Sequence, residues 1–232
     1  MPARQRHAAS PPRPTRTRAP EATRERLVAA AFEEIHRHGY QGTGLDTILA
    51  HAGVTKGALY HHFTDKADLA HAVIDEVIRG LTLQRWTGPL ASYEGDPVSG
   101  IELVLDVVAA EFCDPGLVDM VELGCPLNNL AQEMSPLDER FRRRVVVVFE
   151  TWIESFARAL ERGRADGTVR RDVDARKVAT FVVSSIEGSF GLAKTTKSAL
   201  LLRENFEVLR DFLESLRAAP RPASPPKKRP AR

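Results

Sequence analysis

Side chains that donate hydrogen bonds gather between residues 55 and 66. Thr55, Lys56, Tyr60 and His61 supply hydroxyl, ammonium, phenol and imidazole groups, and Lys66 follows them. Groups of this kind bind the phosphate oxygens of nucleic acids, and lysine also reaches guanine edges. The residues between Lys56 and Tyr60 are small, apart from one leucine, so that a backbone here can approach a partner closely. This set, which includes Gly57 and Ala58, predicts a surface that contacts double-stranded DNA.

Two short helices joined by a tight turn are expected to position these side chains. An apolar stripe with helical spacing covers residues 45–52 and stops at Gly53, which is typical of a helix end. Thr55 can cap the next helix, whose residues Leu59 and Phe63 face inward. This is the pattern of a helix-turn-helix, in which the second helix enters the major groove.

Longer helices are expected on both sides of this motif. One begins at Glu21 and ends at Gly39, and another is capped by Asp65 and runs to about Arg85. The pattern G-Y-x-x-T…I-L-A-x-A-G-V-T-K-G-A-L-Y-H-H-F-x-x-K-x-x-L therefore lies across the short helices and the start of the long one.

In residue types and spacing, this pattern resembles the N-terminal domain of the tetracycline-repressor (TetR) family of bacterial regulators, over residues 23–75. The resemblance implies a three-helix DNA-binding head and a larger helical domain that dimerises and binds a small-molecule effector. It also implies the positions of the DNA contacts, which are Thr43, Thr55, Lys56, Gly57, Tyr60, His61 and Lys66. Gly44 departs from the family, which commonly has Ser or Thr there as cap and phosphate ligand.

The rest of the chain shows helical patterns and no alternating strand pattern. Helices are expected at about residues 98–112, 117–134, 137–164, 174–197 and 202–217, after a loop at residues 87–97, and residues 168–173 are expected to form an extended connection. The fold class predicted is all-α, with about nine helices. The domains predicted are a disordered basic tail (1–20), a helix-turn-helix domain (21–66), an effector-binding and dimerisation domain (67–218) and a second disordered basic tail (219–232).

Charge is distributed unevenly along the 232 residues, whose formal net charge is +2. Ten of the 33 Lys and Arg residues lie in the two tails, whereas all 31 acidic residues lie between them.

No segment is apolar enough to span a membrane, and the N-terminus lacks the apolar core of a secretory signal. Two cysteines, Cys113 and Cys125, fit neither a disulfide framework nor a zinc motif. A cytoplasmic protein with reduced thiols is expected.

The last two long helices are apolar on more than one face, so each needs a second packing partner. The family resemblance implies that they pair with their copies as a four-helix bundle in a symmetric homodimer. Such a dimer places two recognition helices about 34 Å apart, or somewhat more, and predicts a palindromic DNA operator.

Cys125 precedes Pro126, which is well suited to the first turn of a helix. The free N–H groups of a helix start favour a thiolate, so the pKa of Cys125 is expected to be lowered. This segment, GCPLNNLAQEM, with Lys194 further on as a charge partner, resembles a subgroup of the family that includes electrophile-responsive repressors. The alternative interpretation is a buried, inert thiol.

An effector pocket for an uncharged or aromatic molecule is expected in the second domain. Its lining is predicted from apolar helices that carry isolated polar residues: Phe112, Cys125, Asn128, Asn129, Phe149, Trp152, Phe156, Phe181, Ser185 and Phe190, with Lys194 nearby. For each aromatic residue, plain core packing is the alternative.

Nothing in the sequence indicates catalysis, a cofactor or a metal. Nucleotide-binding, metalloprotease and serine-hydrolase motifs are absent, and the adjacent His61 and His62 point about 100° apart on a helix. The function predicted is a dimeric DNA-binding transcriptional regulator, most simply a repressor, released by a small-molecule or electrophilic effector. The alternatives are an effector-blind architectural DNA-binding protein and, more remotely, an enzyme on a repressor-like scaffold.

Overall fold

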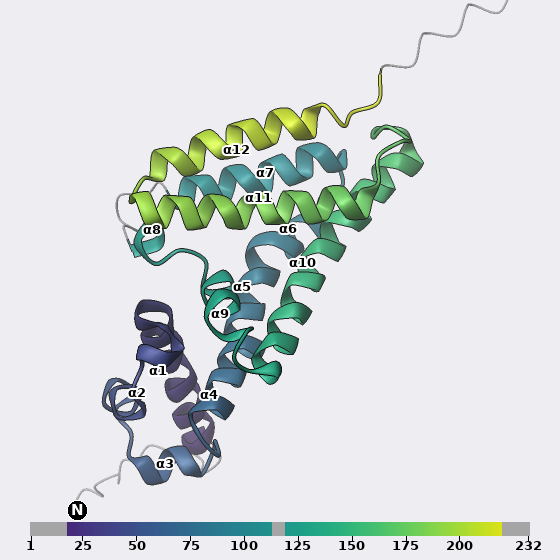
Figure 1. Cartoon of the computed structure of the whole chain (residues 1–232). Coiled ribbons are helices and arrows are strands. Elements are labelled where there is room, and N and C mark those ends of the chain that lie inside the picture. Colours follow the sequence, from purple (N-terminus) through teal and green to yellow (C-terminus); the bar gives the residue numbers. More distant parts are fainter. Residues whose placement is uncertain (1–17, 113–118, 220–232) are drawn as a thin grey trace, which may run out of the picture. The chain divides into compact units, whose positions relative to one another are not determined.

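The structure is a computed structural model that describes residues 18–112 and 119–219. Helices make up most of these residues, and no strand occurs among them apart from one isolated bridge between Val169 and Arg217 (Figure 1). The predicted all-α fold is therefore confirmed. None of the described helices is both long and apolar enough to cross a membrane. Cys113 and nearly all of both tails lie outside the described residues.

The chain divides into two compact units between Val73 and Ile74. A functional division at residue 66 stays a prediction, because the boundary of the units falls inside a continuous helical stretch. This stretch consists of α4 (Lys66–Ala72), η1 (Val73–Ile78), α5 (Arg79–Thr82), η2 (Leu83–Thr87) and α6 (Gly88–Ala91), of which η1 and η2 are π-helical.

The loop predicted at residues 87–97 is shorter than expected, because helical structure continues to Ala91 and resumes at Pro97. The widened π-helical turn at Leu83–Thr87 brings the carbonyl of Leu83 against Gly88, where an added Cβ would lie 2.8 Å from its oxygen. Only glycine fits such an approach. Pro89 follows in the first turn of α6, where its missing N–H costs little.

The first unit contains α1 (Arg18–Gly42), α2 (Leu45–Ala52), α3 (Lys56–Tyr60) and α4. Gly39 takes a non-helical conformation near the end of α1, with φ 77°, which agrees with the helix end predicted there. Gly53 ends α2 in the left-handed conformation with φ 63°, and its N–H bonds the last carbonyls of that helix. Thr55 and Asp65 cap α3 and α4 as predicted. The apolar stripes meet in a small core around Leu27, Ile48, Leu59, Phe63 and Leu69.

The second unit is built on four long helices, α7 (Pro97–Phe112), α10 (Glu139–Asp166), α11 (Ala175–Thr196) and α12 (Ala199–Glu214). Helix α11 packs against α10 and α12, and α12 also packs against α7 (Figure 1). Aromatic rings fill the core between them, with the Trp86 and Trp152 centroids 4.5 Å apart and the Phe112 and Phe190 centroids also 4.5 Å apart.

The single helix predicted over residues 117–134 is wrong in its middle. The described part consists of α8 (Asp119–Leu123) and α9 (Pro126–Met134), with a break at Gly124 and Cys125. Gly124 has φ 69°, and Cys125 is extended with ψ 121°. A residue before proline is disfavoured in the helical conformation, so Pro126 both breaks the first helix and begins the second.

The connection expected at residues 168–173 is short and irregular, and it pairs with the end of the last helix. Arg170 N–H donates to the Leu216 carbonyl at 2.9 Å, and Ala218 N–H donates to the Thr168 carbonyl at 2.9 Å. This pairing uses the residues after Glu214, so α12 ends earlier than predicted. At its other end, the Ser198 side chain accepts a hydrogen bond from the N–H of Leu201 and caps the helix, which begins at Ala199, three residues before the predicted start at Leu202.

Candidate DNA-binding and effector sites

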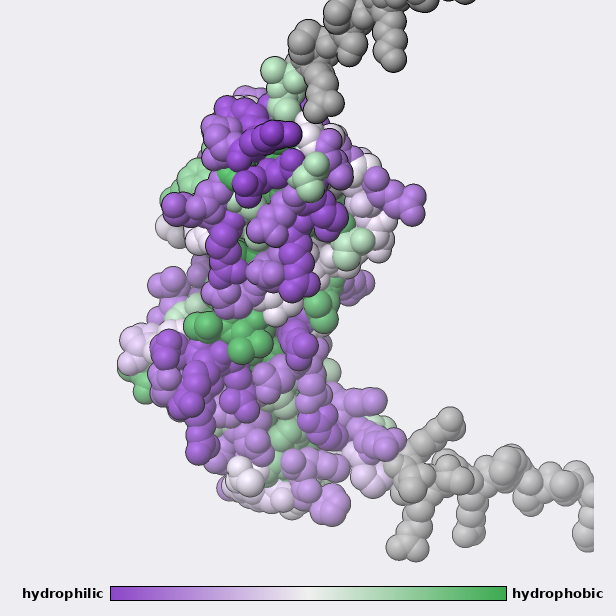
Figure 2. Space-filling view, turned by 90° about the vertical axis from the view of Figure 1, so that its right-hand side faces the viewer, coloured by the Kyte–Doolittle hydropathy of each residue, from purple (hydrophilic) through white to green (hydrophobic). Residues whose placement is uncertain are grey.

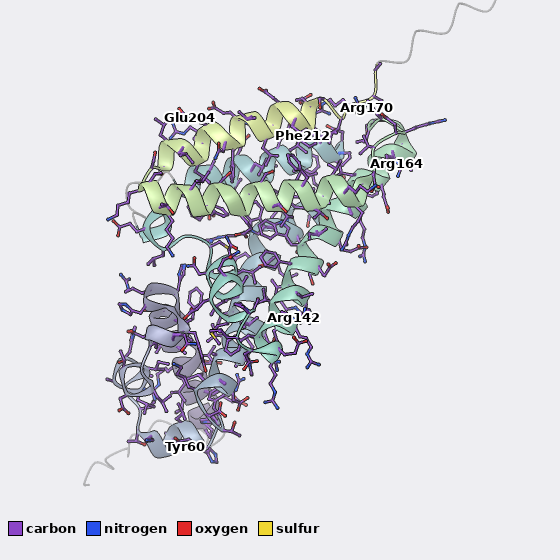
Figure 3. All side chains as sticks on the ribbon, in the orientation of Figure 1. Tyr60, Arg142, Arg164, Arg170, Glu204 and Phe212 are labelled. Atoms are coloured by element: carbon purple, nitrogen blue, oxygen red, sulfur yellow. The ribbon has the colours of Figure 1, made fainter. Side chains whose placement is uncertain are left out.

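One face of α3 is open to solvent, and the other packs into the core of the first unit. Leu59 and Phe63 are 0% and 4% exposed, whereas Tyr60 is 53% exposed. Tyr60 lies on α3 with no helix of this unit over it (Figure 3). Lys56 and His61 are also exposed. The side chains that the sequence singled out as donors therefore share one accessible surface.

Thr55 and Gly57 shape the start of this surface. The Thr55 hydroxyl oxygen accepts a hydrogen bond from Ala58 N–H at 3.3 Å, which fixes the first turn of α3. A Cβ added at Gly57 would meet only the Thr55 hydroxyl oxygen, 4.0 Å away. The fold itself therefore has room for a side chain at position 57. Because Gly57 has none, the backbone there is open to an outside partner.

Thr43 and Lys66, two residues of the predicted contact set, are engaged inside the first unit. The buried Thr43 hydroxyl lies 3.1 Å from the Glu34 carbonyl oxygen and 2.7 Å from that of Gly39. The Lys66 ammonium donates to the carbonyls of Tyr40 at 2.7 Å and Thr43 at 2.8 Å. Both side chains thus hold the junction of α1 and α2 against α4, and their contact with DNA stays a prediction.

Gly44 stands at the N-cap of α2 without a side-chain hydrogen bond to the helix. The helix instead relies on His51 near its other end, whose ring lies 2.8 Å from the carboxylate of Glu34 on α1. The absence of a hydroxyl at Gly44, noted in the sequence, therefore leaves α2 uncapped by a side chain.

Cys125 does stand at the N-terminus of α9, as predicted, but the prediction of a lowered pKa is wrong. Burial and the nearby negative charge of Glu187 raise the pKa of the thiol well above its usual value, and the N–H groups of Asn128 and Leu127 offset only part of this effect. The Cys125 thiol donates a hydrogen bond to Glu187 Oε1 at 3.2 Å. The geometry agrees with the alternative interpretation, a protonated thiol of low reactivity.

Lys194, the predicted charge partner of Cys125, bonds another residue. Its ammonium donates to Asn129 Oδ1 at 3.2 Å, and Asn129 donates in turn to the Leu123 carbonyl at 2.8 Å. Asn128 reaches the Glu187 carbonyl at 3.5 Å. These contacts tie the start of α9 to α11, with Cys125 and Asn128 bonded to Glu187 and Asn129 bonded to Lys194.

Glu187 is the residue that the sequence interpretation missed. It is 6% exposed and lies in α11 between Ile186 and Gly188. Burial raises the pKa of its carboxyl to about 7, although the hydrogen bond from Cys125 acts in the opposite direction. A signal was present, because Glu187 is the only charged residue between Lys177 and Lys194.

The aromatic residues predicted to line one pocket lie on two sides of α11. Phe112, Trp152, Phe156 and Phe190 are buried in the core of the second unit, and Phe149 packs against it. Phe181 is 51% exposed and faces the other way. The prediction of a single pocket lined by all these residues is therefore wrong.

The outer face of α11 forms a shallow groove with α12. Phe181 and Phe212 meet there edge to face, with ring centroids 5.0 Å apart. The groove is largely apolar, and its lining includes Phe181, Ser185, Gly188, Leu192, Val208 and Phe212.

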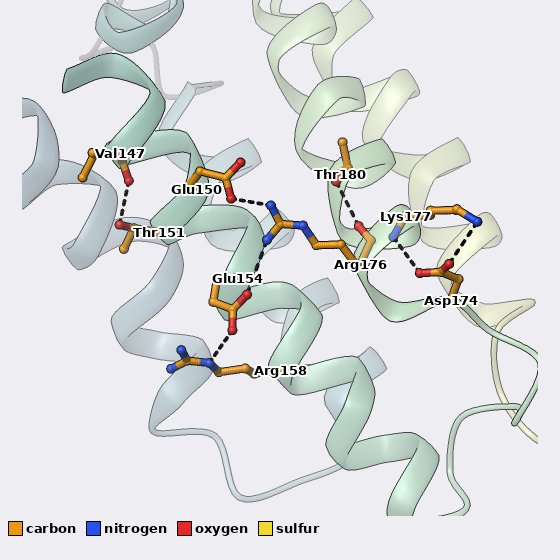
Figure 4. A network of polar contacts seen from close by, with 9 residues as sticks. All are labelled: Val147, Glu150, Thr151, Glu154, Arg158, Asp174, Arg176, Lys177 and Thr180. Carbon is orange, nitrogen blue, oxygen red and sulfur yellow. Dashed lines mark hydrogen bonds and ion pairs between the residues drawn. The ribbon is translucent and has the colours of Figure 1, made fainter. Parts of the chain in front are cut away.

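The surface near the start of α11 is strongly charged. Arg176 of α11 binds Glu150 and Glu154 of α10, and Arg158 donates to Glu154 at 2.8 Å (Figure 4). Exposed ion pairs of this kind contribute little each, but together they fix the register of two helices. Hydrophilic side chains cover most of the face in Figure 2, and hydrophobic surface appears between them in separate smaller areas. No cluster of metal-ligating side chains occurs within the described ranges.

Comparisons with known proteins agree with this architecture. The family model described as "Bacterial regulatory proteins, tetR family" matches residues 27–73, and the model described as "Tetracyclin repressor-like, C-terminal domain" matches residues 108–209. The uncharacterized HTH-type transcriptional regulator YxaF of Bacillus subtilis is 30% identical over 192 residues, which cover 81% of this chain and 94% of the relative.

Two solved structures are similar over most of the chain. A TetR transcriptional regulator from Chloroflexus aurantiacus superposes with a TM-score of 0.77 and 32% sequence identity, covering 87% of this chain and 100% of that one. The reduced form of Escherichia coli NemR gives a TM-score of 0.74 and 26% identity, covering 85% of this chain and 98% of that one. NemR is named a transcriptional repressor.

Proposed function

This chain belongs to the tetracycline-repressor (TetR) family of DNA-binding transcriptional regulators, and from that premise we propose that it is a repressor that binds a palindromic operator as a homodimer. A small-molecule effector releases it from DNA. Its place of action is then the cytoplasm, with no membrane, cofactor or catalytic step involved. The single observation that carries the proposal is the exposed donor face of α3, with Gly57 open at its centre.

The proposed DNA contacts are the residues of that face. Lys56 and Thr55 reach phosphates or base edges, and Tyr60 and His61 donate to phosphates. Gly57 and Ala58 allow the backbone to approach the groove. For Thr43 and Lys66, whose polar atoms bond carbonyls of the first unit, we propose a positioning role that sets the angle at which α3 meets DNA.

The proposed dimer forms through the outer faces of α11 and α12. Phe181 and Val208 are 51% and 68% exposed on these faces, although both are large apolar residues. A patch of this kind is typical of an interaction surface. Because each copy presents the same two helices, a two-fold axis brings them together as a four-helix bundle.

A variant pair tests the dimer directly. Phe181→Arg places a charge in the apolar groove and is expected to shift the protein to monomer in analytical ultracentrifugation. Leu103→Arg is the matched control, because Leu103 on α7 is exposed to nearly the same degree, 50% against 51%. Equal dimer content in the two variants would contradict this interface.

Footprinting tests the DNA-binding proposal. On the promoter DNA that flanks the gene, the protein is expected to protect one discrete palindrome. Lys56→Ala should weaken protection, whereas the control Lys177→Ala, which removes an 85% exposed lysine of the second unit, should not. Protection spread over all DNA with a steep salt dependence would instead favour an architectural protein without regulation.

Release by an effector follows the energetics of a population shift. An effector that binds the DNA-incompetent form more tightly lowers operator affinity in proportion to that difference. The electrophilic effector suggested by Cys125 finds little support in the raised pKa of its thiol. A non-covalent effector is therefore the form of the proposal that the geometry favours.

A further inference from the structure

Among the described residues of the second unit, two of the buried polar atoms without a hydrogen-bond partner belong to side chains of the core; the others, Glu111 Oε2 and Arg164 Nε, belong to partly exposed side chains. Glu187 Oε2 is one of the two core atoms, although the other oxygen of the same carboxyl accepts a hydrogen bond from the Cys125 thiol at 3.2 Å. The indole nitrogen of Trp152 is the second, on a side chain that is only 1% exposed. Buried polar atoms in native proteins are nearly always paired, so each such atom calls for water or a ligand.

The two atoms belong to one continuous part of the core. The Trp152 ring lies against Trp86, with centroids 4.5 Å apart, and the Trp86 ring lies edge to face with Phe190, 6.3 Å away. Phe190 follows Glu187 by one turn on the same face of α11. Helix α10, which carries Trp152, packs directly on α11. A chain of aromatic contacts thus leads from Trp152 to Phe190, one helical turn from Glu187.

We propose that Glu187 and Trp152 are the polar anchors of an effector site in this core, and that the effector is an uncharged aromatic molecule bearing a hydroxyl group. The proposal rests on the effector-binding role proposed above. The effector's ring would pack among Trp86, Trp152 and Phe190. Its hydroxyl group would donate a hydrogen bond to Glu187 Oε2 and accept one from the indole N–H of Trp152.

The chemistry of the two atoms selects a hydroxyl over other groups. An organic cation would pair with the carboxylate but leave the indole N–H without an acceptor. A ligand with only a carbonyl group would accept a hydrogen bond from the indole N–H, but it would have no hydrogen to donate to the carboxylate oxygen. Hydroxyl groups donate and accept, so they match an acceptor at Glu187 and a donor at Trp152. Leaving either atom unpaired in the complex would cost affinity.

Two probes that differ only in their donor test this chemistry. 2-Naphthol has a hydroxyl, whereas 2-methoxynaphthalene keeps the ring and the acceptor oxygen but has no hydrogen to donate. Binding is measured by isothermal titration calorimetry on the full chain at about pH 8, where a carboxyl with a pKa of about 7 is mostly ionised. Wild type is expected to bind 2-naphthol at least about tenfold more tightly than 2-methoxynaphthalene.

Two single-residue variants assign this preference to the two residues. Glu187→Gln keeps the shape of the side chain, whereas Trp152→Phe removes part of the ring together with its N–H. Glu187→Gln replaces the acceptor by an amide donor and should remove the tenfold preference, while Trp152→Phe should weaken both probes alike by about threefold or more. Glu204→Gln, which alters an exposed acid on α12, is the matched control and should keep the wild-type preference. Circular dichroism spectra of all variants verify that the helical fold is kept.

Several outcomes would overturn the assignment. Failure of wild type to bind 2-naphthol would mean that these atoms hold water only, and equal affinity for both probes in wild type would exclude a donor contact to Glu187. An unchanged preference in Glu187→Gln would have the same consequence. Because no DNA is present, this result is independent of the footprint: failure of the ligand assay leaves DNA binding intact, and failure of the footprint leaves the ligand assay intact.

Discussion

Replacing Glu187 by Gln should change how the stability of the protein depends on pH. Burial raises the pKa of the Glu187 carboxyl from 4.5 to about 7, so the folded chain holds a proton that the unfolded chain has already released. The stabilising effect is complete below about pH 4.5 and is lost as pH rises through 7. At about 1.4 kcal/mol per pKa unit, the difference amounts to roughly 3 kcal/mol of unfolding free energy.

Urea unfolding of wild type and Glu187→Gln at about pH 5 and about pH 8, followed by circular dichroism at one protein concentration, measures this difference. Gln cannot ionise, so the stability of wild type relative to the variant should fall by about 2–3 kcal/mol between these pH values, most of the full difference. Fixed concentration matters because dimerisation adds to apparent stability.

The variant Glu204→Gln serves as the control, because it makes the same substitution at an exposed position of α12. If the stability difference between wild type and Glu187→Gln is the same at both pH values, then Glu187 is ionised in the folded state across this range. The reasoning from burial would then be refuted.

Three further predictions concern the first unit and Cys125. Gly57→Ala should raise the melting temperature, since alanine stabilises a helix by about 0.5–1 kcal/mol relative to glycine and the fold has room for the added methyl group. The same variant should weaken operator binding in a mobility-shift assay. Unchanged binding would contradict the proposed close approach of the backbone to DNA at this position. Gly44→Ser should supply the missing cap of α2 and stabilise the protein by a few tenths of a kcal/mol in thermal unfolding, and a fall in stability would show that Gly44 is kept for its backbone. Cys125 should react slowly with iodoacetamide at about pH 7, and faster in Glu187→Gln because the negative charge that disfavours the thiolate is gone; fast reaction in wild type would contradict the raised pKa.

The DNA-binding head was predictable because its signals are local. Gly53, Thr55 and Asp65 each act on the turn or helix next to them in sequence, and each takes the conformation or cap that its type predicts. Thr43 and Lys66 show the limit of such reasoning. Their polar atoms bond carbonyl groups that folding brings near. The Lys66 ammonium, for example, donates to the carbonyl of Thr43, which lies 23 residues earlier in the chain.

The effector region was predicted less well because its contacts join distant segments. The thiol of Cys125 is desolvated by burial and meets a carboxylate 62 residues away, and the two effects together raise its pKa instead of lowering it. The placement of Phe181 and Phe190 could have been found from the sequence. Nine positions at about 100° each put them on opposite faces of one helix, so they could not line the same pocket.

These opposite faces give α11 a specific place in the proposed regulation. Its inner face carries Glu187 against α9 and α10, and its outer face carries Phe181 in the groove that we assign to the dimer. An effector anchored at Glu187 would therefore act on the same helix that carries the proposed dimer surface. Coupling between effector and operator requires that two sites bias one shared element, and α11 meets that requirement without a chain of intermediate contacts. If binding of 2-naphthol leaves the dimer affinity and operator affinity unchanged, α11 does not transmit the effect.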